Sequence, residues 1–138
     1  MKTYKYFLLF LIMISFSGYA QNKNIAHKPL IINILIDAEK NVYIEEYKTS
    51  NEKVIPSIQK IVNNTPSNKH EGVIYRIFAD GSLQHGVIMD VDQLLLEAYQ
   101  PIKTKTEKYL LDLKENDLDG PDWTKKLNKL DLKASRIN

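Results

Sequence analysis

The sequence predicts an α+β fold in two layers, with a small sheet carrying its helices on one face and a helical C-terminal extension. Short runs rich in β-branched and aromatic residues alternate with longer segments whose apolar residues recur every three or four positions. Two of the runs are separated by only a few turn residues, which indicates antiparallel pairing. The predicted order over residues 30–100 is strand, strand, helix, strand, helix.

Composition limits both the size and the class of the protein. The chain has 138 residues and is 43% hydrophobic, which suffices for one domain with a core but not for two. Of the 19 basic residues, Lys2 and Lys5 precede residue 21, which leaves 17 against 17 acidic residues in the rest of the chain. This balance argues against a nucleic-acid-binding surface, which needs a net positive charge.

Residues 1–20 have the pattern of a secretory signal peptide. Two lysines precede an apolar run from Tyr6 to Phe16, and small residues at Gly18 and Ala20 indicate cleavage after Ala20. The uncharged stretch is 15 residues long, whereas a spanning helix needs ~20, so a short N-terminal anchor is the alternative. The chain contains no cysteine, which excludes disulfides and thiolate metal sites.

A hairpin is predicted at the start of the domain. Residues 21–29 form a polar lead-in, and residues 30–36 are strongly apolar, as in a buried strand. Asp and Asn in residues 37–41 favour a turn, after which residues 42–44 resume as a second strand. The short connector predicts antiparallel pairing, with the second strand nearer an edge.

The first helix is predicted over about residues 51–64. Thr49 and Glu52 match a capping box, in which the hydroxyl and the carboxylate each satisfy a backbone amide at the helix start. We expect Pro56 to lie within about the first turn, where its missing amide costs little. The apolar residues of this segment share one helical face, which is expected to dock on the sheet: Val54, Ile55, Ile58, Ile61 and Val62.

Residues 72–99 predict a strand, a tight loop and a second helix. The strand covers Val73 to Phe78, and beyond Gly86 the apolar residues recur at helical spacing. The connection from the first hairpin through the first helix to this strand is expected to be a right-handed crossover.

The C-terminal third predicts a helical extension over residues 101–131. The second helix either continues past a kink at Pro101 or gives way to a third helix. Asp122 is expected to cap a further short helix, and residues 132–138 to form a loose tail. The residues at helical spacing are Ile102, Thr106, Tyr109, Leu110 and Leu113 in the first part, and Trp123, Leu127 and Leu130 in the second.

Residues 77–91 contain three local motifs: the strand end Ile77-Phe78-Ala79-Asp80, the pair His85-Gly86 and a Val-Ile-x-Asp-Val helix start. With the order strand, strand, helix, strand, helix, these motifs resemble the periplasmic domain of the ExbD/TolR biopolymer-transport family. The resemblance covers roughly Leu30 to Tyr99. It implies a domain that dimerises and couples ExbB/TolQ-like partners to TonB- or TolA-like proteins or to the cell wall. It also implies location in the periplasm, or attachment to the inner membrane facing the periplasm if the N-terminal segment stays uncleaved.

Two departures from the family pattern are expected. Family members carry a transmembrane helix with an essential Asp, but Tyr6 to Ala20 contains no acidic residue that could relay a proton at membrane depth. Typical members also have a fourth strand directly after the second helix, where residues 102–113 here have helical spacing. The simplest interpretation is an exported periplasmic domain without the motor helix.

The loop after the second long strand is the candidate site for a partner or ligand. It contains Asp80, Gly81, Ser82, His85 and Gly86. An Asp at a strand end also commonly makes turn or cap hydrogen bonds, so a structural role for Asp80 is the alternative.

The remaining candidate residues lack the spacing that catalysis or metal binding requires. His27, His70 and His85 lie in the lead-in and in loops, without a helical i, i+4 pair, so neither a metal nor a cofactor is expected. Asp90 and Asp92 are two apart on a helix and cannot face each other. No nucleophile elbow or phosphate-binding glycine loop is present in the sequence, and we expect no enzymatic activity.

The expected function is that of an envelope protein acting by protein–protein contacts in a TonB/Tol-type energy-transduction or transport assembly. Its expected partners are a second copy, ExbB/TolQ-like proteins or TonB/TolA-like proteins, with membrane contact only if residues 1–20 stay attached. The alternative is a free periplasmic binding module that recognises peptidoglycan or a small ligand.

Overall fold

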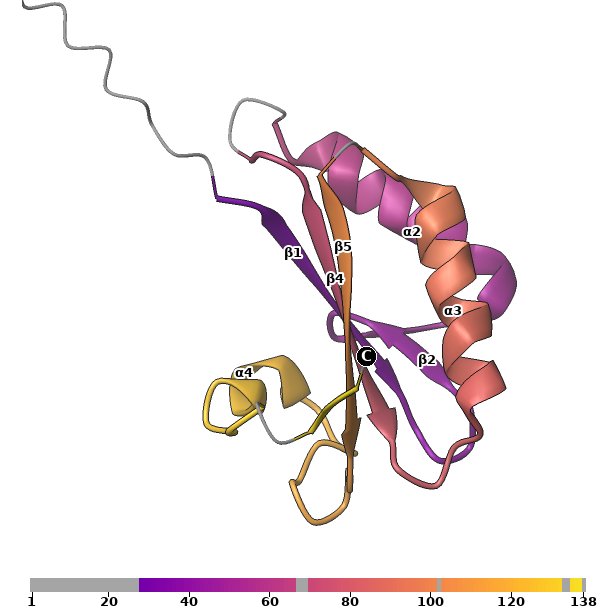
Figure 1. Ribbon diagram of the computed structural model, residues 1–138, viewed down its shortest axis with the longest axis vertical. Helices are drawn as coiled ribbons and strands as arrows, with labels where there is room; N and C mark the ends of the chain where they lie inside the picture. Colours follow the sequence, from indigo (N-terminus) through magenta and orange to yellow (C-terminus); the bar gives the residue numbers. More distant parts are fainter. Residues whose placement is uncertain (1–27, 67–69, 102, 133–134, 138) are drawn as a thin grey trace, which may run out of the picture.

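The computed structural model describes residues 28–66, 70–101, 103–132 and 135–137. They form a six-stranded mixed sheet with helices α2 (Asn51–Asn64) and α3 (His85–Ala98) on one face and the short helix α4 (Trp123–Leu127) on the other (Figure 1). The predicted α+β class is confirmed. The leader predicted for residues 1–20 lies outside the described residues.

The sheet has the order β3-β2-β1-β4-β5-β6. Its three central strands are parallel to one another, and the outer strands pair antiparallel with their neighbours. The strands are β1 (Leu30–Ile36), β2 (Val42–Ile44), β3 (Tyr47–Thr49), β4 (Val73–Asp80), β5 (Thr104–Leu111) and β6 (Arg136–Ile137).

The hairpin of β1 and β2 is confirmed, but the short strand β3 was not predicted. Glu45 adopts a left-handed conformation (φ 51°), which turns the chain back so that β3 pairs antiparallel with β2. The Glu45 carboxylate accepts a hydrogen bond from the backbone N–H of Asn33 at 2.8 Å, which holds this turn against β1. Three exposed or half-exposed residues are too few for a periodic pattern to indicate a strand.

Helix α2 has the predicted bounds, but the capping box is wrong. Thr49 ends β3, and the N-cap is Ser50, whose side chain makes no capping hydrogen bond. Pro56 is the sixth helical residue, so it lies in the second turn and not in the first. In a regular helix the N–H at position 56 would bond to the carbonyl of Glu52. Because Glu52 and Pro56 are both on the exposed side of the helix, water can bond to that carbonyl instead.

The first face of the sheet, the one covered by α2 and α3, holds an aliphatic core. Alternate residues of the strands point to it, as the period of two requires. Tyr75 is fully buried there, and its hydroxyl donates to the carbonyl of Tyr99 at 2.8 Å. Burial raises the pKa of Tyr75 to about 12. The core residues include Ile32, Ile34, Ile36, Val54, Ile58, Val73, Ile77, Ile88, Val91 and Leu95.

Strand β5 replaces the helix expected over residues 102–113. It runs parallel to β4, and its odd-numbered residues Tyr109 and Leu111 point to the second face while Lys108 points to the first. The residues at positions 102, 106, 109, 110 and 113 fit a helical period. Tyr109, Leu111 and Leu113 also fit a strand period, and they are the ones that are buried. Pro101 therefore precedes a strand and does not kink a helix.

Of the predicted helical extension, the described residues of 101–131 contain only the helix α4. Trp123 and Leu127 are buried in it, as expected. Asp122 has a left-handed conformation (φ 60°) and makes no capping hydrogen bond; its carboxylate instead accepts from Lys125 at 2.6 Å. The predicted loose tail also contains β6, which pairs with β5.

The second face of the sheet holds an aromatic core. Phe78 stacks on Tyr109 with ring centroids 5.1 Å apart and meets Trp123 edge-on at 6.1 Å. The buried members of this cluster are Leu35, Phe78, Tyr109, Leu111, Leu113, Leu118, Trp123 and Leu127.

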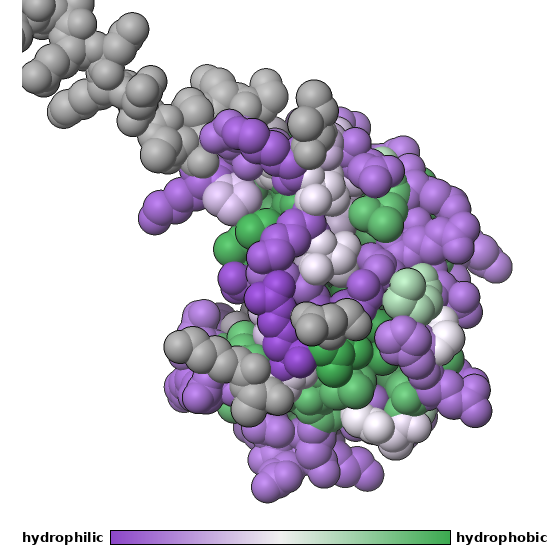
Figure 2. All heavy atoms as spheres, in the orientation of Figure 1, coloured by the Kyte–Doolittle hydropathy of each residue, from purple (hydrophilic) through white to green (hydrophobic). Residues whose placement is uncertain are grey.

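The segment that carries α4 covers only part of the second face. Figure 2 shows a hollow on the α4 side of the molecule, where hydrophobic and hydrophilic residues adjoin. Ile31, which points to this side, is 39% exposed. Further along the face the Glu107 carboxylate is bound by Arg76 at 3.2 Å and Lys105 at 2.8 Å, and accepts from the Tyr109 hydroxyl at 2.9 Å.

Candidate functional site

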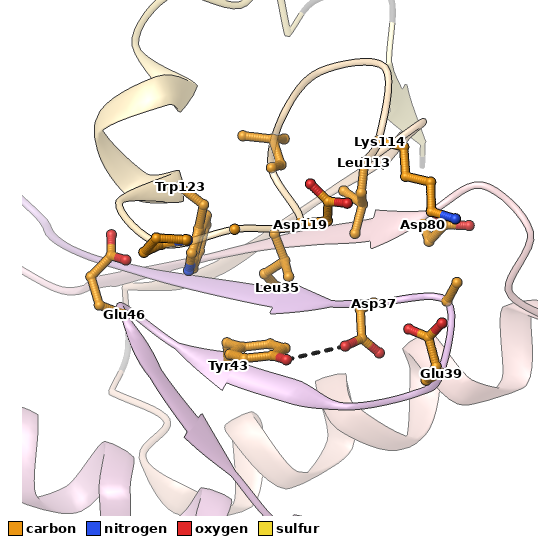
Figure 3. Close-up of a pocket in the computed structure, with 14 residues that line it drawn as sticks. Leu35, Asp37, Glu39, Tyr43, Glu46, Asp80, Leu113, Lys114, Asp119 and Trp123 are labelled. Carbon is orange, nitrogen blue, oxygen red and sulfur yellow. Dashed lines mark hydrogen bonds between the residues drawn. The ribbon is translucent and has the colours of Figure 1, made fainter.

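A pocket of about 400 Å³ opens on the second face, where the β1–β2 turn, the end of β4 and the segment after β5 meet (Figure 3). The carboxyl ends of parallel strands are where open α/β sheets bind ligands. The lining residues are Leu35, Asp37, Ala38, Glu39, Tyr43, Glu46, Asp80, Leu113, Lys114, Leu118, Asp119, Gly120, Pro121 and Trp123.

Trp123 forms an aromatic wall of the pocket and is the only tryptophan of the chain. Its side chain is 3% exposed, and its Nε1 has no hydrogen-bond partner among the described residues. In Figure 3 the indole nitrogen lies at the edge of the ring that points to the sheet, on the side of Tyr43 and Glu46. A buried N–H without an acceptor costs about 1–3 kcal/mol, so this group is a candidate to donate to a bound molecule.

The β1–β2 turn supplies a second wall that is held rigid. Asp37 accepts hydrogen bonds from the backbone N–H and the side-chain amide of Asn41, both at 2.8 Å. It also accepts from the Tyr43 hydroxyl at 3.2 Å, the bond drawn in Figure 3. Burial, and then the negative charge of Asp37, raise the pKa of Tyr43.

Glu46, in the turn between β2 and β3, holds the segment that covers the second face, residues 112–132. We call residues 112–132 the covering segment. Its carboxylate accepts from the backbone N–H of Thr124 at 3.1 Å and from the Thr124 hydroxyl. Thr124 lies in the first turn of α4, so Glu46 satisfies a helix-start amide that Asp122 was expected to satisfy.

The pocket is acidic. Five carboxylates line it, against one lysine, Lys114, among the described lining residues. Within the described part of the chain, Glu39 and Asp119 form no hydrogen bond or salt bridge through their carboxylates, and both residues are exposed. Their charges are therefore available at the rim.

Of the predicted loop, Asp80 alone lines this pocket. Its carboxylate accepts from the backbone N–H of Ser82 at 3.0 Å and from the Ser82 hydroxyl, and the hydroxyl bond is the main cause that lowers the pKa of Asp80. The amide of Gly81 donates to the carbonyl of Leu111 at 2.9 Å. The geometry thus gives Asp80 the turn role that the sequence left open as the alternative.

The other two loop residues lie away from the pocket. His85 and Gly86 form the first turn of α3 and are exposed. The structure therefore does not gather the five predicted residues into one site. It brings Asp80 together with residues 35–46 and 113–123, which were not predicted, although the lone Trp123 beside an acidic segment was a signal that could have indicated them.

A second candidate surface lies along β3, which forms one edge of the sheet. Tyr47 is 79% exposed, and a groove of about 330 Å³ separates this strand from α2. Sheet edges can pair with a strand of another chain. The groove is lined by Ile44, Tyr47, Lys48, Thr49, Ser57, Lys60, Ile61 and Asn64.

The described residues contain neither a group of metal ligands nor a membrane-spanning helix. No three histidine or acidic side chains in these ranges are grouped as metal ligands. No helix in the described ranges has the length and hydrophobicity that a membrane crossing requires.

Comparison with models of known protein families gave no match for this chain, and comparison with curated proteins gave no significant match.

Proposed function

We propose that the chain is a non-enzymatic envelope protein that acts by protein–protein contacts in a TonB/Tol-type energy-transduction or transport assembly. The observation that carries the proposal is β5, Thr104–Leu111. The ExbD/TolR family, which the sequence of residues 30–99 resembles, has its last strand directly after the second helix, and β5 occupies that place. One of the two departures expected from the sequence is thereby removed.

The arrangement around β5 gives further support. Both long helices lie on one face of the sheet, as expected from the right-handed crossover connection. The exposed edge of β3 offers a surface for a second copy or for a partner of the ExbB/TolQ or TonB/TolA kind. Export to the periplasm by residues 1–20, with or without cleavage, belongs to the same proposal.

The absence of cysteine from the natural sequence allows a direct test of self-association. In the full-length chain, Tyr47→Cys places one thiol at the β3 edge, and Asp90→Cys places one on the exposed side of α3 as the matched control. If the β3 edge forms a symmetric dimer, mild oxidation will cross-link the first variant and leave the second monomeric.

Partner binding is tested by affinity capture of the full-length chain from detergent-solubilised envelopes. Enrichment of a proton-channel or TonB-like component is the expected result. A chain that stays monomeric in the cross-linking test and captures no such component would contradict the proposal.

A second candidate, a free periplasmic module that binds peptidoglycan or a small ligand, is favoured by the pocket beside Asp80. Its test is co-sedimentation of the full-length chain with purified cell-wall sacculi. Asp80→Ala should weaken binding, whereas His85→Ala should not, because His85 does not line the pocket. Equal binding by the wild type and both variants would exclude the pocket as the wall-binding site.

A further inference from the structure

We propose that the pocket beside Trp123 binds a lysine or arginine side chain of a partner protein, presented on an extended peptide segment. The inference rests on the proposed role in protein–protein contacts and names the chemistry that one of these contacts would use. It is carried by three features of the pocket: its excess charge, its aromatic wall and its unpaired donor.

The excess charge is local. Residues 21–138 contain equal numbers of acidic and basic side chains, yet the pocket gathers five carboxylates against Lys114. Asp37, Asp80 and Glu46 are engaged in hydrogen bonds that build the walls. Glu39 and Asp119 form none through their carboxylates among the described residues, and they come from opposite sides of the opening, the β1–β2 turn and the covering segment. A cation between them would be attracted by both.

The aromatic wall favours an organic cation over a hydrated metal ion. Tyr43 and Trp123 both line the pocket, and an ammonium or guanidinium group is attracted to the face of such rings. A cation of the chain itself already lies beside this wall: the Lys48 ammonium, on β3 opposite Tyr43, is 5.9 Å from the centre of the Tyr43 ring. The aliphatic part of a lysine or arginine side chain would also contact Leu35 and Leu118 at the base of the pocket.

The unpaired donor distinguishes a peptide from a simple amine. Trp123 Nε1 is buried and lacks an acceptor within the described chain. A protonated amine or a metal ion offers no acceptor for an N–H, whereas each peptide unit offers a carbonyl oxygen. A basic residue within a peptide therefore supplies both the cation for the rim and the acceptor for the indole. The volume of about 400 Å³ is within the range of about 300–1,000 Å³ that ligand pockets have.

The experiment uses the full-length chain, a blocked tri-lysine peptide as the probe, and the fluorescence of Trp123, the only tryptophan of the chain. We expect saturable quenching or enhancement by tri-lysine and none by a blocked tri-glutamate peptide. In ¹H–¹⁵N spectra the indole N–H resonance should move with tri-lysine and stay in place with butylamine, which has a cation but no carbonyl.

The variants separate a specific pocket from a general charge effect. Glu39→Gln with Asp119→Asn should weaken tri-lysine binding by roughly tenfold, as the loss of two exposed ion pairs implies. The matched control, Glu97→Gln with Asp90→Asn, removes the same charges from α3 on the opposite face and should leave affinity within about twofold. Equal weakening by both pairs, or no response of Trp123 to tri-lysine, would overturn the proposal.

The outcome is independent of the test of the proposed function. Tri-lysine binding without capture of envelope partners would leave the pocket assignment standing and remove the envelope role. If envelope partners are captured, the Glu39 and Asp119 substitutions do not change that capture, and tri-lysine does not bind, the envelope role would stand and the pocket assignment would be removed.

Discussion

The two faces of the sheet are covered in different ways, although the same strands supply both. Odd and even residues of β1, β4 and β5 alternate between an aliphatic core under two 14-residue helices and an aromatic core under a loop segment with one five-residue helix. Two long helices cover the first face and leave a groove beside β3, whereas the short cover of the second face leaves a hollow and a pocket. We therefore expect the first face to provide most of the stability, and the recognition proposed above would use the second face.

The largest effect is expected from a cavity in the first face. Ile77 is a residue of β4 and is fully buried in the aliphatic core beneath the helices. Ile77→Ala should therefore lower the free energy of unfolding by about 2–5 kcal/mol. Urea denaturation followed by circular dichroism measures this change. Met89→Ala, at a residue that is 42% exposed on α3, is the control and should cost less than about 1 kcal/mol. Similar costs for the two substitutions would remove the distinction between a stabilising face and a recognising one.

A smaller, pH-dependent effect is expected from Glu107 on the second face, which binds Arg76, Lys105 and Tyr109. Hydrogen bonds from Lys105, Tyr109 and Arg76 lower the pKa of Glu107 to about 2, below its ordinary value of 4.5. Because the folded value is the lower one, the stabilisation is present above about pH 5 and is lost as the pH falls towards 2. Glu107→Gln should therefore cost about 1–2 kcal/mol at pH 7 and almost nothing near pH 2.

The measurement is the difference in urea midpoint between the wild type and Glu107→Gln as a function of pH. Glu97→Gln, an exposed position on α3, should show a difference that is small and independent of pH. A Glu107→Gln difference that persists unchanged at pH 2.5 would show that packing, and not charge, is lost in the variant.

The smallest global effect is expected from the contact that joins the hairpin to α4. Glu46→Ala removes the acceptor of the Thr124 amide, and losing such a cap costs about 1 kcal/mol. Since the covering segment is the weaker region, hydrogen exchange should accelerate over residues 113–130 and stay unchanged in α2 and β1. Uniform acceleration over the whole chain would show that the two faces open together.

The sequence predicted the first face well because its helices have strong periodicity. Val54, Ile58 and Val62 define the buried side of α2 with no ambiguity, and β1 is a continuous apolar run. β5 was predicted incorrectly because a window of ten residues with mixed Thr, Lys and Leu fits both a period of two and a period of 3.6. The segment is a strand because β4 has a free edge with which it can pair. Whether that edge is free depends on the tertiary structure and not on the local sequence.

The pocket could not be predicted, because its walls come from three separate parts of the chain. Asp80 was identified from its place at a strand end, but Glu39 and Asp119 are 80 residues apart in the sequence and each has only the pattern of a turn residue. Trp123 was assigned to a helix core, and it is buried there. The unpaired state of its N–H depends on which groups surround it after folding, and no local pattern encodes that.

The position of β5 along the chain has a consequence for the order in which the protein can fold during synthesis. Strands β1 to β5 and helices α2 and α3 have been made by residue 111, and the cover of the second face follows only after that. Chains emerge from the N-terminus, so the aliphatic core can close while Leu35 and Phe78 are still uncovered. A nascent chain in this state exposes an apolar surface on one side of a sheet that still lacks β6, and the synthesis of the following residues determines how long that interval lasts.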